Sequence, residues 1–110
     1  MRLDAARDDL RRGRRLRGDE VPIRLAPHAI ERYAERVTPD LDPEAVARSL
    51  AAMLPSLTVL AEPPEWLKSR EAHTIAYAMI GPGVCLPIMI NHRGDEMIAT
   101  TAMVEGSISE

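Results

Sequence analysis

Residues 27–37 read Pro-His-Ala-Ile-Glu-Arg-Tyr-Ala-Glu-Arg-Val and decide the first part of the fold. At about 100° per residue, their apolar side chains gather on one side of a helix. These side chains are Ile30, Tyr33, Ala34 and Val37. Pro27 suits the first helical turn, where its missing N–H is not needed, and Thr38-Pro39 ends the element. We therefore predict an amphipathic helix over residues 27–37.

A second helix is expected directly after the first. Asp42 is a typical N-cap residue, and Pro43 and Glu44 suit the first turn that follows it. Pro55 ends this element. Its buried stripe is expected to consist of Val46, Leu50, Met53 and Leu54.

From residue 56 onward the apolar period changes from about 3.6 to about 2, which predicts strands. The expected strands cover residues 56–61, 73–80, 84–91 and 96–104. Pro87 lies inside the third of them, which implies a bulge or an edge position. The order of elements predicts an α+β fold in which two N-terminal helices pack on a three- to four-stranded antiparallel sheet.

Charge is distributed unevenly along the 110 residues. The net charge is −3, but residues 1–20 sum to +2 and residues 21–110 to −5. Five arginines fall within residues 11–17, namely Arg11, Arg12, Arg14, Arg15 and Arg17. Leu3, Ala6 and Leu10 could line one face of a short helix, but nothing beyond Gly13 continues it. We predict a flexible, arginine-rich arm over residues 1–20 and a single domain over residues 21–110.

Composition limits the class of protein. Apolar residues make up 45% of the chain, which suffices for one small core. Cys85 is the single cysteine, which excludes an intramolecular disulfide and a thiolate-rich zinc site. No apolar run approaches the roughly 18 residues that span a bilayer, and the charged N-terminus does not resemble a signal peptide. We expect a cytoplasmic protein without membrane contact, metal or cofactor.

His28, Arg32 and Arg36 follow one another at i, i+4 spacing and so form one row on the polar face of the first helix. Glu31 and Glu35 form a parallel row. A titratable imidazole beside two fixed cations could bind a phosphate and move a proton near neutral pH. A solvated amphipathic helix with charges placed by chance would show the same pattern.

The His/Arg row, the short second helix and the strands ending in a threonine-containing strand resemble small RelE-like toxin domains. These domains share the metal-independent ribonuclease fold of barnase, colicin nucleases and RelE. The resemblance covers about residues 24–104, and its most specific piece is His-Ala-Ile-Glu-Arg-Tyr-Ala-Glu-Arg at residues 28–36.

The resemblance implies RNA cleavage in which a 2′-hydroxyl attacks the adjacent phosphate. His28 would then be the general acid or base. Arg32 and Arg36 would stabilise charge on the phosphate oxygens. A hydroxyl of the last strand, Thr100 or Thr101, would orient the phosphate.

Other features favour a binding protein. The chain from residue 21 onward carries −5, holds a single Lys and has no tyrosine after Tyr77, whereas ribosome-dependent RelE proteins are typically basic and often use a C-terminal tyrosine. An acidic surface binds RNA poorly, because phosphate neutralisation supplies most non-specific affinity. The open alternative is a non-catalytic phage or mobile-element inhibitor of a host protein. The expected partner is RNA or a protein, either an antitoxin or a host target. Formation of a homodimer is a further alternative.

The five arginines of residues 11–17 and Trp66 are the candidates for nucleic-acid or partner binding. The arginines could contact nucleic acid, bind an acidic protein or be solvated, and no interleaved aromatic residues offer stacking platforms for bases. Trp66 lies in the segment 63–71, which begins with two prolines. There it would either cover the core or anchor a partner.

Overall fold

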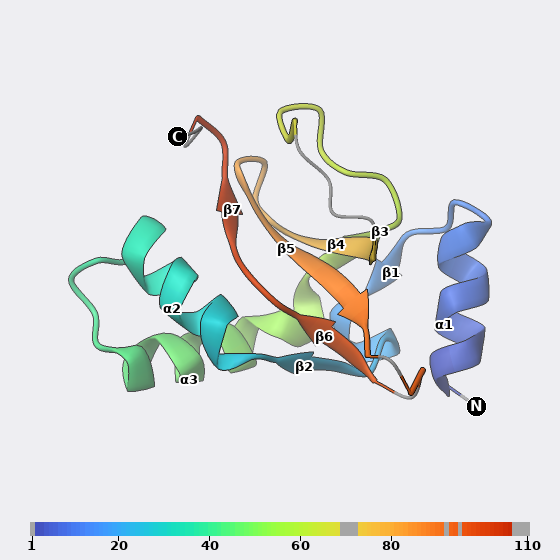
Figure 1. The fold of residues 1–110 in the computed structure, drawn as a ribbon, viewed down its shortest axis with the longest axis horizontal. Helices are drawn as coiled ribbons and strands as arrows, with labels where there is room; N and C mark the ends of the chain where they lie inside the picture. Colours follow the sequence, from blue (N-terminus) through green and yellow to red (C-terminus); the bar gives the residue numbers. More distant parts are fainter. Residues whose placement is uncertain (1, 69–72, 92, 95, 107–110) are drawn as a thin grey trace.

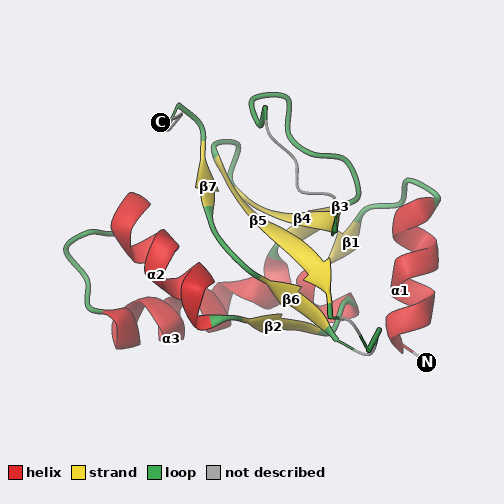
Figure 2. Ribbon diagram, in the orientation of Figure 1, coloured by secondary structure: helices red, strands yellow, loops and turns green. Residues whose placement is uncertain are grey.

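Three α-helices surround one curled sheet in the computed structural model, which describes residues 2–68, 73–91, 93–94 and 96–106 (Figures 1 and 2). The helices are α1 (Arg2–Arg11), α2 (Pro27–Arg36) and α3 (Pro43–Met53). The strands are β1 (Leu16–Arg17), β2 (Ile23–Leu25), β3 (Thr58–Leu60), β4 (Thr74–Ile80), β5 (Val84–Ile90), β6 (Met97–Ala99) and β7 (Met103–Val104). Two short 3-10 turns, η1 (Gly18–Glu20) and η2 (Leu54–Ser56), connect them.

The α+β class is confirmed, but the sheet is larger than expected and is mixed. Its order is β1-β3-β4-β5-β6-β2, and β7 also pairs with β5. All pairs are antiparallel except β2 with β6, which is parallel. The structure therefore adds two strands, β1 and β2, that the expected three- to four-stranded antiparallel sheet does not include. These strands have two and three residues, which is too short to show a period of two.

The two helices predicted from their capping signals are confirmed. The N-terminus of α3 has Asp42 as its cap, whose side chain accepts a hydrogen bond of 2.8 Å from the backbone N–H of Ala45. Val46 and Leu50 of α3 are buried, as are Ala29 and Tyr33 of α2. The two helices lie side by side at one end of the molecule (Figure 1).

The expected last strand over residues 96–104 is divided into β6 and β7. Ile88 of β5 pairs with Ala99 of β6, and Cys85 of β5 pairs with Met103 of β7. Three positions of β5 (88 to 85) therefore lie opposite four positions of the C-terminal segment (99 to 103). The extra residue forms a bulge opposite Pro87, whose carbonyl accepts a hydrogen bond of 3.3 Å from the N–H of Thr100. Because Pro87 has no N–H to donate, the regular ladder is interrupted at this position.

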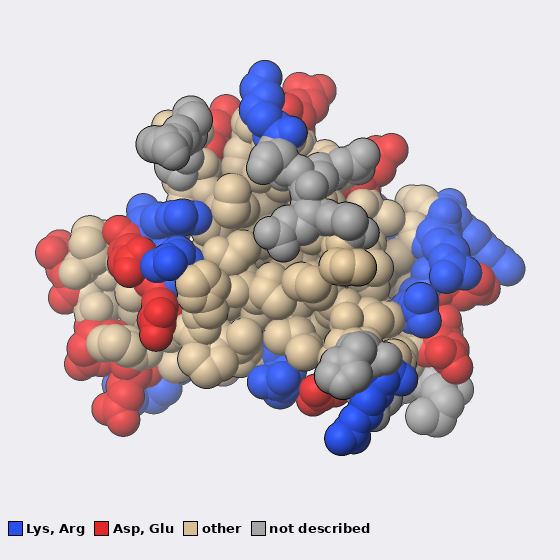
Figure 3. Space-filling view, in the orientation of Figure 1, with Lys and Arg blue, Asp and Glu red and all other residues tan. Residues whose placement is uncertain are grey.

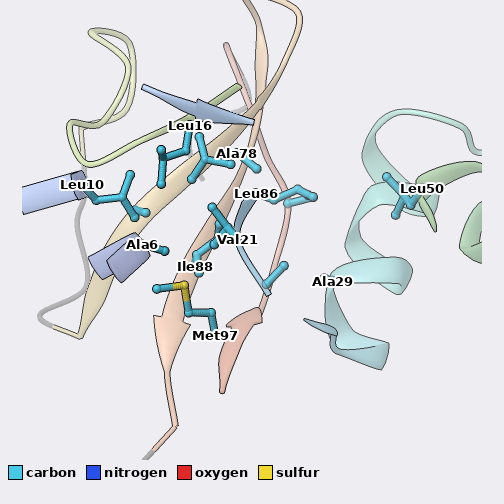
Figure 4. Close-up of a cluster of buried hydrophobic side chains, with 14 of the residues drawn as sticks. Ala6, Leu10, Leu16, Val21, Ala29, Leu50, Ala78, Leu86, Ile88 and Met97 are labelled. Carbon is cyan, nitrogen blue, oxygen red and sulfur yellow. The ribbon is translucent and has the colours of Figure 1, made fainter. Parts of the chain in front are cut away.

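The structure differs from the expectation for the first twenty residues: residues 2–20 are part of the folded domain and not an arm beside it. The apolar face of α1 lies in the core, with Leu10 only 3% exposed, and β1 pairs with β3. The N–H of the buried Gly18 donates to the carbonyl of Leu57 at 2.8 Å. Figure 4 shows Ala6, Leu10 and Leu16 in the same cluster as Ile88 and Leu86 of β5. The short apolar stripe of α1 is enough to hold this helix in the fold, because the stripe packs against the end of the sheet.

No helix among the described residues is long and apolar enough to cross a membrane.

Candidate functional site

The N-terminus of α2 is fixed to the end of β6. Leu25 of β2 lies opposite Ala99 of β6 in the parallel pair. The N–H of Ala26, the N-cap residue, donates to the carbonyl of Ala99 at 3.0 Å. The first turn of α2, which carries His28, therefore begins beside the point where β6 ends.

The C-terminus of α2 is fixed to the same segment, at the bulge. Arg36 Nη1 donates to the carbonyl oxygen of Ala102 at 2.7 Å and lies 3.7 Å from Met103 Sδ. The bulge leaves this carbonyl outside the ladder with β5, so a guanidinium can reach it. As a result α2 runs beside residues 99–103, which include Thr100 and Thr101 (Figure 1).

The polar face of α2 carries the His/Arg row, and the two glutamates beside it, Glu31 and Glu35, each lie near a member of that row. Arg32 Nη1 lies 2.8 Å from Glu35 Oε1, and its side chain is 31% exposed. His28 Nδ1 lies 4.0 Å from Glu31 Oε1, and 54% of the imidazole side chain is exposed. Each pair joins residues three apart, so the two rows expected from the sequence are joined across the helix surface.

Thr100 and Thr101 are half-buried in the bulge next to α2. In the described part of the chain, no hydrogen bond joins either hydroxyl to His28, Arg32 or Arg36. The two attachments of α2 therefore bring the segment that carries the threonines beside the helix that carries the row, without such a bond between the threonine hydroxyls and the row.

The arginines of residues 11–17 lie at the opposite end of the molecule, along its longest extent of 39 Å (Figure 1). All five are exposed. Three of them form surface ion pairs with neighbouring acids: Arg12 with Asp8 (3.3 Å), Arg14 with Asp9 (3.6 Å) and Arg17 with Asp19 (3.8 Å). Figure 3 shows this group of basic residues over α1, separate from the smaller group over α2. The structure does not join the arginine segment to the His/Arg row.

Trp66 is fixed to the turn between β4 and β5. Its Nε1 donates to the carbonyl of Pro82 at 2.9 Å, and the residue is half-buried outside the main core cluster. It therefore closes over the hairpin turn. This contact tests neither of the roles expected for Trp66, as a cover over the core or as an anchor for a partner.

Cys85 is a core residue. Its side chain is fully buried in β5, and burial raises the pKa of the thiol from 9.0 to about 12, because the thiolate would lose its hydration. The thiol is therefore protonated at neutral pH. Within the described residues, no group of three or more His, Cys, Asp or Glu side chains is arranged to hold a metal ion.

Two features of the site are absent from the sequence-based prediction. The carbonyl of Ala102 as the partner of Arg36 depends on the bulge, which only Pro87 signals. The ion pair between Arg24 Nε and Glu96 Oε2, at 3.1 Å, joins β2 to the residue that precedes β6, across 72 positions, and has no local signal.

No family model, no curated protein and no solved structure matches this chain.

Proposed function

We propose that this protein is a small RelE-like, toxin-type endoribonuclease that cleaves RNA without a metal ion. The observation that supports the proposal is the double attachment of α2 along residues 99–103, by Ala26 at one end and Arg36 at the other. It places His28 and Arg32 on the helix that adjoins Thr100 and Thr101. An imidazole, a guanidinium group and a hydroxyl are groups that can catalyse phosphodiester cleavage without a metal ion.

In the proposed reaction the 2′-oxygen forms a bond to phosphorus and the bond to the 5′-oxygen breaks. The products are a 2′,3′-cyclic phosphate and a 5′-hydroxyl. His28 accepts the proton of the 2′-hydroxyl or protonates the leaving oxygen, and solvent takes the other role. Arg32 stabilises the charge on the non-bridging phosphate oxygens. Arg36 has one nitrogen committed to Ala102, so it chiefly positions the helix.

The test is cleavage of single-stranded RNA in the presence of EDTA by the wild-type chain and by His28→Ala. We expect His28→Ala to lower the cleavage rate by about 10²- to 10⁴-fold, the usual contribution of general acid–base catalysis. His73→Ala is the matched control, because His73 is also exposed and lies outside α2. Equal rates for His28→Ala and His73→Ala, or no cleavage by the wild-type chain, would contradict the proposal.

A second candidate is a non-catalytic inhibitor that binds a host protein through its acidic surface or its arginine segment. The observation that favours it is the separation of charge: residues 21–110 sum to −5, and the exposed arginines lie at the far end. This candidate requires a tight, salt-sensitive complex with a larger protein and no turnover of RNA. Cleavage that is lost in His28→Ala would exclude it as the main function.

A further inference from the structure

A groove lies between α1 and the neighbouring ends of β3 and β4, at the end of the molecule away from α2. Its volume is about 200 Å³, and it is lined by Arg7, Leu10, Arg11, Ala61 and Ile75. Leu10 is buried, and Ala61 and Ile75 are half-buried apolar residues that pack against the core. The groove thus combines an apolar surface with two guanidinium groups from one helix.

Arg7 and Arg11 are one helical turn apart and face the same side of α1. In the part of the chain that the structure describes, neither forms an ion pair, although the neighbouring Arg12 and Arg14 pair with Asp8 and Asp9. Two like charges at this spacing destabilise a helix. An anion between the two guanidinium groups would offset that repulsion through charge-assisted hydrogen bonds.

The surroundings of the two arginines limit the kind of anion. A second hollow of about 500 Å³ on the outer side of α1 is also lined by Arg7 and Arg11, together with Asp4 and Asp8. A solute can therefore reach the guanidinium groups from solvent. The two carboxylates would repel an extended polyanion, and the apolar surface of Ala61 and Ile75 offers nothing to a bare phosphate. The groove is also smaller than the roughly 300–1,000 Å³ of drug-sized pockets.

We infer that this groove binds a small organic carboxylate with a short aliphatic or aromatic body. The carboxylate accepts hydrogen bonds from Arg7 and Arg11, and the apolar body lies against Leu10, Ala61 and Ile75. The inference does not depend on the proposed ribonuclease activity, because the groove shares no residue with the His/Arg row.

The test is an NMR titration of the full chain that follows the signals of Leu10, Ala61 and Ile75, with hexanoate as the probe. We expect saturable shifts at these three residues. Acetate lacks the apolar body and hexanol lacks the charge, so each is expected to bind at least about tenfold more weakly.

Matched variants separate this site from general attraction by positive charge. The double variant Arg7→Gln/Arg11→Gln is expected to weaken hexanoate binding at least about tenfold. The double variant Arg12→Gln/Arg14→Gln removes the same charge from ion-paired positions and is expected to leave hexanoate binding unchanged. Ala61→Leu fills the groove without changing the charge and is expected to abolish binding.

Equal binding of hexanoate and hexanol, or of hexanoate and acetate, would overturn the inference. Equal weakening by the two double variants, or no saturable shift at the three residues, would overturn it as well. If Ala61→Leu fails to fold, the two double variants decide the question, because they change exposed or half-exposed side chains.

Discussion

Helices α1 and α2 are each ten residues long and carry arginines, yet they are held in place by different contacts. Helix α1 packs on the end of the sheet through three apolar side chains, and Arg11 in its last turn is exposed to solvent. Helix α2 also buries apolar residues, but in addition Arg36 bonds to the carbonyl of Ala102. The role of an arginine in this protein therefore follows from what its guanidinium contacts, and the number of arginines in a segment does not reveal that role.

The largest expected effect concerns the attachment of α1. Leu10→Ala removes a side chain that is 3% exposed in the core cluster. We expect it to lower the free energy of unfolding by about 2–5 kcal/mol, because it leaves a cavity at the contact between α1 and the sheet. Chemical denaturation followed by circular dichroism measures this change.

The matched control is Leu41→Ala, which removes the same atoms from a residue that is 47% exposed. It is expected to change stability by no more than about 0.5 kcal/mol. Equal, small effects of the two variants would show that α1 is not packed in solution and that residues 1–20 are an arm.

Gly18→Ala is expected to have a smaller effect on the free energy of unfolding. The sign of this effect distinguishes a folded segment over residues 1–20 from a flexible arm. A Cβ at Gly18 would overlap the carbonyl oxygen of Leu54, which is backbone and cannot move aside easily. We expect a loss of about 1–3 kcal/mol in the free energy of unfolding, the usual range for overpacking. In an unstructured segment, replacing this glycine would carry no such penalty.

Gly83→Ala is the control for Gly18→Ala, since its added Cβ would make an ordinary contact with Glu105 at 3.6 Å. Its effect on the denaturation midpoint is expected to be small. A Gly18→Ala protein as stable as the wild type would contradict the close packing of η1 against η2.

The smallest effect concerns the attachment of α2. Arg36→Ala removes the donor to Ala102, and we expect a loss of about 1–2 kcal/mol, because the acceptor lies in a half-buried bulge. Arg32→Ala breaks an exposed i, i+3 pair with Glu35 and is expected to cost about 0.5 kcal/mol or less. Thermal denaturation of the two variants side by side measures the difference. A larger effect for Arg32→Ala would show that the bond to Ala102 does not fix the helix.

The sequence predicts the parts of this fold that are set by local signals. Pro27, Asp42 and Pro43 mark the starts of α2 and α3, alternation marks β4, and a nearly all-apolar run marks β5. Strand β3 is shorter than the strand expected over residues 56–61. The sequence does not predict β1 and β2, because strands of two or three residues are defined by the partner with which they pair. The packing of α1 was missed for the same reason: Leu3, Ala6 and Leu10 become a core face only where the end of the sheet meets them.

The candidate site was predictable to a similar extent. The i, i+4 spacing places His28, Arg32 and Arg36 in one row, since all three lie on α2. The contact of that row with residues 99–103 spans more than sixty positions and arises from the bulge opposite Pro87. Pro87 indicates an irregularity in the strand. It does not indicate which carbonyl is left without a partner in the ladder or which side chain donates a hydrogen bond to that carbonyl.

In the proposed function, the α2 end performs the chemistry, whereas the arginines of the α1 end contribute at most to binding. The most direct measurement is the rate of RNA cleavage in EDTA at saturating protein, comparing His28→Ala with the double variant Arg14→Gln/Arg15→Gln. We expect His28→Ala to be slowed at least about 100-fold even at saturation. The double variant reaches the wild-type rate and at most needs more protein to do so. A His28→Ala protein that cleaves at the wild-type rate at saturation would show that the α2 end does not perform the chemistry.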